Sequence, residues 1–243
     1  MKALILAAGI ASRLRPLTDA TPKCLLKIGE RCLLERTFDA LISNQIVDFV
    51  VVTGYCDSQI IDFLNRRYIG LNIKFIHNEC YSSTNNIYSL WLAKSEARGQ
   101  DILLLDSDIL FDPQIITAVL NNPASNALAL NRHELGEEEI KVIIDSDQRV
   151  VEISKVCSIE DALGESVGIE KMSSCYTEAL YAELDQMIEV ENQKNVFYER
   201  AFERLISKDF FFEVEDTTKY FSIELDTVDD FNQAKRLIPI ELY

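Results

Sequence analysis

Short apolar runs alternate with amphipathic stretches through the first 120 or so residues, and this alternation constrains the fold more than any other feature. The run Lys2–Ala8 is apolar after its first residue and leads into Gly9, as a buried parallel strand does. Leu33–Asn44 has helical spacing. The other expected elements of this half are strands at Phe49–Val52, Ile73–Ile76 and Ile102–Leu105 and helices at Ser58–Arg67, Ile87–Glu96 and Pro113–Leu120. This order predicts an α/β fold, a mostly parallel sheet with helices on both faces.

The pattern changes from about Asn126, where short runs are separated by turn signals such as Asp145-Ser146-Asp147. We expect antiparallel strands here, added to the sheet or folded over it. They are predicted at Ala127–Asn131, Ile140–Asp145, Val150–Ile153 and Val167–Lys171, followed by helices at Ala179–Glu191 and Phe197–Ile206, strands at Phe210–Val214 and Phe221–Leu225, and a helix at Thr227–Leu237. Thr227 is the expected N-cap of the last helix. With no repeats and no linker, residues 1–243 are predicted to form one domain.

Charge and cysteine usage narrow the class of protein. Forty acidic residues against 24 Lys and Arg give a net charge of −16, so we expect no nucleic-acid partner, because such binding needs a basic face. The six cysteines form no CxxC pair and no zinc-like spacing with a histidine, which favours buried thiols in a reducing compartment. The apolar stretch at the N-terminus is too short for a signal peptide or a membrane span. These features predict a soluble cytoplasmic protein with no membrane partner.

The segment Leu6–Lys23, called the signature segment below, carries the chemistry. It runs from the first strand through Leu6-Ala7-Ala8-Gly9 into a loop with Ser12 and Arg13, and it ends at Pro22-Lys23. Small residues at the carboxyl end of a buried strand let backbone N–H groups approach phosphates closely. Arg13 can hold phosphate oxygens with two hydrogen bonds, and Lys23 supplies a compact positive charge. The segment is neither a GxGxxG fingerprint nor a Walker P-loop.

The signature segment resembles the pattern L-x-A-G-x-x-x-R-L-x-P-L-T-x-x-x-P-K of the sugar-phosphate and choline-phosphate nucleotidyltransferases, and it matches every fixed position. The resemblance implies a Rossmann-like nucleotidyltransferase fold. It implies that the loop from Ala7 to Arg13 wraps a nucleoside triphosphate and that Lys23 neutralises its α-phosphate. It further implies that residues 1–125 bind the nucleotide and that residues 126–243 bind the acceptor.

Two acidic motifs complete the expected site. Leu103-Leu104-Leu105-Asp106-Ser107-Asp108 is an apolar strand that ends in two carboxylates, and carboxylates with substrate phosphates are the usual ligands of Mg²⁺. The resemblance implies a metal-binding Asp at this strand end, which Asp108 matches better than Asp106. A second metal-binding Asp is implied by the later motif Glu224-Leu225-Asp226-Thr227. The predicted catalytic set is therefore Arg13, Lys23, Asp108 and Asp226, with Asp108 and Asp226 holding Mg²⁺ and Asp106 beside the nucleotide.

The stretch from Asn78 to Leu90 is similar to the N-x-x-Y-x-x-x-N-N-x-Y-S-L segment of bacterial choline-phosphate cytidylyltransferases. Asn and Ser side chains can read the edge of a pyrimidine, so Asn85 and Ser89 are the expected base contacts, with Tyr55 a weaker candidate. This similarity implies CTP as the nucleotide. The reaction would be in-line attack of a phosphate or phosphonate oxygen on the α-phosphorus, which needs positioning and charge neutralisation more than a strong base.

The acceptor half resembles a different subfamily. The stretches 139–142, 153–155 and 164–169 are similar to cytidylyltransferases that act on 2-aminoethylphosphonate. Lys141, Lys155 and Glu165 are the expected acceptor-binding residues. Lys155 lacks the proline that follows the corresponding lysine in the wider family. Choline-type enzymes carry a Trp near position 137, where this chain has Glu137-Glu138-Glu139. The sequence therefore predicts a small phosphorylated or phosphonate acceptor, either phosphocholine-like, 2-aminoethylphosphonate or a phosphorylated amino acid.

Two other functions stay open. A sugar-1-phosphate nucleotidylyltransferase would share the signature segment, although the Gly-Leu-rich loop of those enzymes is absent here. A non-catalytic relative that senses nucleotide would have no need of two metal carboxylates. The HxGH type of cytidylyltransferase is excluded, because His77 and His133 lack that spacing. A homodimer is compatible with the sequence, which leaves the oligomeric state open. The acceptor class suggests a role in modifying cell-surface polysaccharide or lipid.

Overall fold

A parallel four-stranded core lies at the centre of the computed structural model, which describes residues 1–243. Its strands are β1 (Lys2–Ala7), β4 (Asp48–Thr53), β5 (Asn72–His77) and β6 (Ile102–Asp106). They are hydrogen-bonded in the order β6-β1-β4-β5, with Leu6 of β1 opposite both Val52 and Asp106. Because the strands are parallel, their carboxyl ends meet at one edge of the sheet. The predicted parallel sheet is confirmed.

Strands from the second half extend this sheet on the β6 side. They are β8 (Ala127–Asn131), β9 (Lys141–Ile144), β10 (Val150–Ser154), β11 (Gly164–Met172) and β12 (Glu213–Asp216). The sheet runs β10-β9-β11-β6 into the core, and β8 pairs with both β11 and β12. The pairs β11–β6, β11–β8, β11–β9 and β10–β9 are antiparallel, as expected, whereas β12 is parallel to β8. A register shift between Ser166 and Glu170 bends β11 at Gly168.

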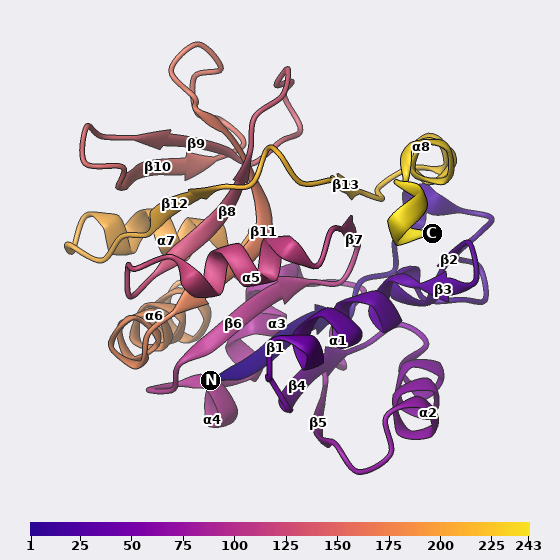
Figure 1. Ribbon diagram of the computed structural model, residues 1–243. Helices are drawn as coiled ribbons and strands as arrows, with labels where there is room; N and C mark the ends of the chain where they lie inside the picture. The colour runs from indigo at the N-terminus through magenta and orange to yellow at the C-terminus, as the bar shows by residue number, and fades with distance from the viewer.

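Helices cover both faces of the sheet (Figure 1). They are α1 (Leu33–Ser43), α2 (Asp57–Arg67), α3 (Asn86–Leu92), α4 (Lys94–Ala97), α5 (Gln114–Asn121), α6 (Ser174–Asp185), α7 (Glu199–Ile206) and α8 (Val228–Leu237). Alternate residues of β1 belong to two hydrophobic cores, one on each face of the sheet. Ala3 and Ile5 pack with α1, α2 and α5, whereas Leu4 and Leu6 pack with α3, α6 and α7. Burial on both faces explains the continuous apolar run of β1.

A third, smaller core attaches the C-terminal part of the chain to the signature segment. It joins Leu14 and Leu26 to Leu225 and to Phe231 of α8. The hairpin of β2 (Lys27–Ile28) and β3 (Arg31–Cys32) lies beside it, and β7 (Ile109–Phe111) pairs antiparallel with β13 (Ser222–Glu224). Figure 1 shows α8 and the C-terminus next to the β2–β3 hairpin. Residues more than 200 positions apart in the sequence are thereby brought together.

The remaining short helical turns are 3₁₀ turns at Ser12–Leu14, Lys23–Leu25 and Ile240–Leu242 and one π-helical turn at Gln186–Val190 after α6. Thr227 caps α8 as predicted, since its hydroxyl accepts a hydrogen bond from the Asp230 amide and the Asp230 carboxylate accepts one from the Thr227 amide.

Three predicted elements need correction. The helix expected from Ala179 begins at Ser174, because the Ser173 hydroxyl accepts a hydrogen bond from the Tyr176 amide and caps it. The strand expected at Phe210–Val214 is shifted to β12, since the Phe212 ring packs on Tyr176 and pairing with β8 starts only at Glu213. The helix expected at Ile87–Glu96 breaks at Ala93 into α3 and α4.

Candidate active site

A cleft of about 980 Å³ opens at the carboxyl ends of β1 and β6. That volume lies at the upper end of the range of small-molecule sites and is large enough for a nucleotide with a second small ligand. The signature segment forms one wall, through Leu6, Ala7, Ala8, Gly9 and Arg13 and through Lys23. Residues from β11, from β13 and from the start of α7 line the rest of the cleft.

Lys23 joins the two acidic motifs. Its ammonium donates to Asp108 Oδ2 at 2.9 Å and to Asp226 Oδ1 at 2.8 Å, and Arg13 forms an ion pair with Asp226 as well. Burial acts to lower the pKa of Lys23, but the two carboxylates outweigh it and the net shift is upward. Burial likewise acts to raise the pKa of Asp226, whereas Lys23, Arg13 and Lys155 hold it below its usual value. The four residues predicted to be catalytic therefore lie in one cluster with alternating charge.

The pairing of β7 with β13 creates this cluster. Asp108 directly precedes β7, its carbonyl accepts a hydrogen bond from the Leu225 amide at 3.0 Å, and Ile109 stands opposite Glu224 in the register. Alternation along the extended chain then places Glu224 and Asp226 on one side and Leu225 in the third core. Sequence motifs more than 100 residues apart meet because two three-residue strands pair.

Three carboxylates of the cluster are close enough to bind one metal ion. Oxygens of Asp108, Glu224 and Asp226 all lie within 4.8 Å of one another. Asp108 Oδ1 is buried without a hydrogen-bond partner, which a bound cation would satisfy. Partial desolvation in the cleft, and then Asp108 and Asp226, raise the pKa of Glu224. Hard carboxylate oxygens suit Mg²⁺, so the donor set fits that ion. The sequence analysis did not name Glu224 as a candidate ligand, although the alternation in Glu224-Leu225-Asp226 places it on the same side as Asp226.

Asp106 lies in the floor of the cleft, at the end of β6. The Tyr198 hydroxyl donates to its Oδ2 at 2.9 Å. Burial and the neighbouring acids raise the pKa of Asp106 well above its usual value. The bend of β11 passes directly over this carboxyl, because Gly168 has a φ of +73° and a Cβ there would lie 2.8 Å from Asp106 Oδ2. A glycine is required at this point for both reasons.

We predict that Gly168→Ala lowers the free energy of unfolding by about 1–3 kcal/mol, the usual cost of such backbone strain plus a close contact. Urea denaturation measures this change. Gly70→Ala is the matched control, since Gly70 also has a positive φ, of +90°, but a Cβ there meets no atom within 4 Å. Equal losses in the two variants would contradict a role for the contact with Asp106.

The candidate base-binding residues line the end of the cleft at α3. Asn85 caps α3 through its side chain, which accepts from the Asn86 amide, and its own amide donates to the Lys194 carbonyl at 2.9 Å. Ser89 is buried and its hydroxyl accepts from the Asn78 amide group at 3.1 Å. Asn78 is 1% exposed and also orders the turn that precedes Asn85, through the Cys80 amide. Asn78 is a positioning residue that the sequence analysis did not single out.

Two of the expected acceptor residues line the opposite end of the cleft. Glu165, on β11, pairs with His133 at 2.7 Å. Lys155 follows β10 and extends over the ring of Phe197 at 4.8 Å from its centroid. Its ammonium also pairs with Glu138 at 3.4 Å. Lys155 lines the same cleft as Asp226 and Glu165 but forms no ion pair with either.

Three expected site residues do not line the cleft. Lys141 is 2% exposed and donates to the carbonyls of Gly136 and Glu139, so it orders the loop before β9 and is not free to bind an acceptor. The Tyr55 hydroxyl lies 2.9 Å from the Thr18 carbonyl oxygen, where it holds the signature segment from outside. Ser12 is exposed in its 3₁₀ turn, whereas its neighbours Ala11 and Arg13 line the cleft.

This geometry agrees with the comparison against known families. A family model described as the MobA-like NTP transferase domain matches residues 3–203. The chain belongs to this family. The match spans the parallel core, the signature segment and Asp108. It ends before Glu224 and Asp226, which reach the site of this NTP transferase domain through the β7–β13 pair.

Several relatives of this chain are cytidylyltransferases by name. Choline-phosphate cytidylyltransferase from Streptococcus pneumoniae is 36% identical over 107 residues, which are 44% of this chain and 45% of that protein. This match thus spans less than half of that relative's length. CTP:phosphoglutamine cytidylyltransferase from Campylobacter jejuni is 25% identical over 228 residues, covering 86% of this chain and 89% of that one.

The fold is shared with a solved structure over nearly the whole chain. The structure of CTP:phosphocholine cytidylyltransferase from Streptococcus pneumoniae superposes with a TM-score of 0.79 at 24% identity, covering 98% of this chain and 99% of that one. The nucleotidyltransferase fold predicted from the sequence is confirmed.

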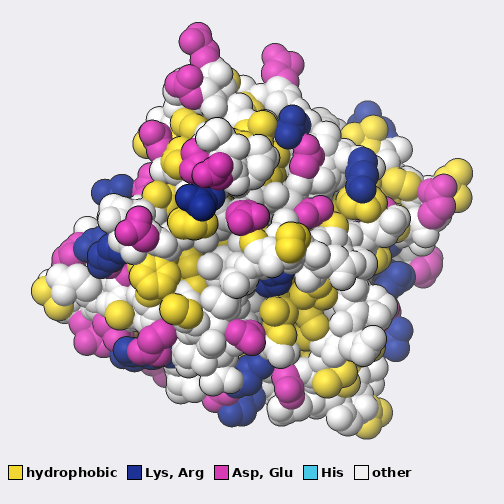
Figure 2. Space-filling model, turned by 60° about the vertical axis from the view of Figure 1, so that its left-hand side comes forward, with side chains coloured by type: hydrophobic (Ala, Val, Ile, Leu, Met, Phe, Trp, Pro, Cys, Tyr) yellow, Lys and Arg dark blue, Asp and Glu magenta, His cyan; other side chains and the backbone are white.

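The surface of the NTP transferase domain mixes both signs of charge. On the face shown in Figure 2, lysine and arginine side chains are interspersed among more numerous acidic ones, in keeping with the net charge of −16. None of the helices combines the length and the apolar composition that crossing a bilayer requires.

Proposed function

We propose that this chain is a Mg²⁺-dependent cytidylyltransferase that transfers CMP from CTP to a small phosphorylated or phosphonate amine and releases pyrophosphate. The observation that carries the proposal is the convergence of Arg13 and Lys23 with the carboxylates of Asp108, Glu224 and Asp226. The relatives named above are cytidylyltransferases, and one acts on choline phosphate and another on phosphoglutamine, as their names state.

The proposed reaction is a direct displacement at phosphorus. An anionic oxygen of the acceptor attacks the α-phosphorus of CTP in line, and a new P–O–P bond forms. The bond from the α-phosphorus to the bridging oxygen breaks, and pyrophosphate leaves with the electron pair. The nucleophile is already anionic, so no side chain has to remove a proton, and the protein contributes position and charge.

The charged residues of the signature segment neutralise the triphosphate. Lys23 lies against the transferred α-phosphoryl group, Arg13 holds phosphate oxygens, and the backbone from Ala7 to Gly9 approaches the chain of phosphates. Asp108 and Asp226, with Glu224, would hold the Mg²⁺ ion, which orients the phosphates and offsets their charge when bound.

The two halves of the chain serve the two substrates in this proposal. Residues 1–125 bind CTP, with Asn85 and Ser89 reading the pyrimidine edge. Residues 126–243 bind the acceptor, whose phosphate or phosphonate lies at Lys155. The presence of Lys155 in the lining of the same cleft as Lys23 and Asp226 supports this assignment, because an acceptor phosphate there shares the cleft with the transferred group.

A screen for pyrophosphate release tests the proposal. Purified protein, Mg²⁺ and either CTP or UTP are combined with phosphocholine, 2-aminoethylphosphonate, phosphorylated amino acids or sugar 1-phosphates. We expect release with CTP and a phosphorylated or phosphonate amine. Release with sugar 1-phosphates alone would support a sugar nucleotidyltransferase instead. Tight nucleotide binding with no turnover of any acceptor would support a nucleotide sensor.

We predict that Gly9→Ala raises the KM for CTP by roughly tenfold, about 1.4 kcal/mol of lost binding. A Cβ at Gly9 meets no protein atom within 4 Å, so the variant should fold with unchanged stability and obstruct only the triphosphate. Steady-state kinetics with a matched thermal melt separate the two effects. An unchanged KM for CTP would contradict the placement of the phosphates beside this part of the loop.

A further inference from the structure

Glu199 is the buried acid of the cleft that the reaction proposed above does not use. It is the first residue of α7, it is 5% exposed, and it lines the acceptor end of the cleft. Its Oε2 atom is buried and has no hydrogen-bond partner. An unpaired buried carboxylate oxygen costs free energy unless a ligand satisfies it. A cationic or hydrogen-bond-donating ligand is therefore expected at this point.

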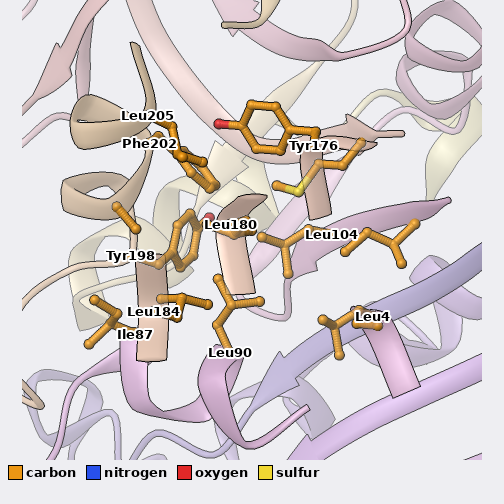
Figure 3. Packing of buried hydrophobic residues seen from close by; sticks show 14 of the residues in the cluster. Leu4, Ile87, Leu90, Leu104, Tyr176, Leu180, Leu184, Tyr198, Phe202 and Leu205 are labelled. Carbon is orange, nitrogen blue, oxygen red and sulfur yellow. The ribbon is translucent and has the colours of Figure 1, made fainter. Parts of the chain in front are cut away.

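The position of Glu199 is fixed by its neighbour Tyr198. The ring of Tyr198 is fully buried among residues of α3, α6 and α7, where Figure 3 shows it packed beside Ile87, Leu184 and Phe202. Its backbone amide donates to Asn86 Oδ1 at 2.9 Å and its hydroxyl donates to Asp106. Glu199 is thus held rigidly relative to both α3 and β6, as a specificity residue should be.

The charge around Glu199 is negative on balance. Burial raises the pKa of Asp106 and of Glu170, and the nearby Glu199 adds to both rises. The Glu170 carboxyl is fully buried, and one of its oxygens has no hydrogen-bond partner. Burial raises the pKa of Glu199 to about 7, Glu203 on the same helix adds to that rise, and Lys155 acts against it. Lys155 pairs with Glu138 at 3.4 Å and lines the cleft together with Asp226 and Glu165. A ligand with an anionic end at Lys155 and a cationic end at Glu199 matches this order of charges.

The aromatic side chains of the cleft are poorly placed to hold a quaternary ammonium. Such groups donate no hydrogen bonds and are bound by the faces of several aromatic rings. Tyr81 and Phe197 are the aromatic residues that line the cleft, and Lys155 already lies over the ring of Phe197. Trp91 stacks on Tyr88 and donates its indole N–H to Asp185, away from the cleft. A primary ammonium instead needs hydrogen-bond acceptors, which Glu199 and Glu165 provide.

We propose that Glu199 selects acceptors that carry a primary ammonium group, by accepting its hydrogen bonds in the cleft that Glu165 also lines, while Lys155 holds the phosphate or phosphonate. The inference rests on the proposed function and deepens it, since it names the headgroup that the enzyme prefers. The acceptor class is a short zwitterion with phosphate or phosphonate at one end and –NH₃⁺ at the other.

Three acceptors that differ only in the headgroup test the inference. Phosphoethanolamine carries a primary ammonium, phosphocholine carries its trimethylated form, and ethyl phosphate carries no nitrogen. We expect the wild-type kcat/KM with CTP to be at least roughly tenfold higher for phosphoethanolamine than for either of the other two. This measurement needs no variant, so a folding defect cannot obscure it.

Glu199→Gln should reduce the ratio of phosphoethanolamine to ethyl phosphate by roughly tenfold or more, because the charge that pairs with the ammonium is lost. Glu203→Gln, one turn further along α7 and ion-paired with Arg200, is the matched control and should keep the wild-type ratio. If Glu199→Gln does not fold, Glu199→Asp keeps the charge on a shorter side chain and should lower the same ratio by a smaller factor.

The outcomes separate the two proposals. Equal rates for the three acceptors, a preference for phosphocholine, or a Glu199→Gln ratio equal to that of wild type would overturn the headgroup inference and leave the proposed function standing. Turnover of none of the three acceptors, nor of any other phosphate with CTP, would overturn both.

Discussion

Lys23→Ala should lose at least about a hundredfold in kcat, since one preorganised positive group aimed at the transition state commonly contributes a factor of about 10²–10³. The ammonium bridges Asp108 and Asp226 at 2.9 and 2.8 Å, so in the proposed reaction it lies where the transferred phosphoryl group meets these carboxylates. Steady-state turnover of CTP with a phosphorylated amine measures the loss.

The fold should survive this substitution. Asp108 and Asp226 are both partly exposed to the cleft, so water can solvate them after the ammonium is removed. Circular dichroism and a thermal melt check this point. Lys27→Ala is the control, because Lys27 is an exposed lysine on β2 a few residues further along. A near-normal rate for folded Lys23→Ala would contradict the proposed catalytic role of Lys23.

Asp108→Asn is the second substitution with a large expected effect, a loss of roughly a thousandfold in kcat. The amide has nearly the same shape as the carboxylate but no charge, so Lys23 loses one partner and Mg²⁺ loses an anionic ligand. The Mg²⁺ concentration that gives half-maximal activity should rise together with the loss of rate. That second readout separates a metal ligand from a residue that only positions Lys23.

Asp229→Asn provides the control for the metal, because Asp229 is an exposed aspartate in the first turn of α8 close to Asp226 in the sequence. It should leave both the rate and the Mg²⁺ dependence at wild-type values. A wild-type Mg²⁺ dependence of the Asp108→Asn enzyme would contradict the proposal that Asp108 binds the metal.

The parallel core could be predicted because β1, β4 and β6 are buried on both faces and because amphipathic segments alternate with the strands. Ala3 to Ala7 had to be apolar throughout, and the change to a small-residue loop at Gly9 marked the ligand edge of the sheet. The candidate catalytic residues were predictable for a related reason, since Lys23 and Asp108 belong to local motifs that the chain carries intact.

Residues whose role depends on long-range packing could not be predicted in this way. Lys141 and Lys155 both lie near strand ends in the sequence and look alike there. In the structure Lys141 donates to the Gly136 carbonyl, whereas Lys155 lines the cleft. Glu199 belongs to an ordinary amphipathic helix in the sequence. In the structure Tyr198 is buried and bonded to Asp106, and the adjacent Glu199 lines the cleft.

Transfer of the α-phosphate of CTP tests the central claim most directly. CTP labelled in its α-phosphate is incubated with the enzyme, Mg²⁺ and phosphoethanolamine, and the labelled products and free pyrophosphate are measured together. We predict that the label moves into a diphosphate-linked cytidine product in equal amount to the pyrophosphate released, and that chelation of Mg²⁺ stops both. Label that stays in CTP with every phosphorylated amine, phosphonate and sugar phosphate, or that appears only as free CMP, would contradict the account.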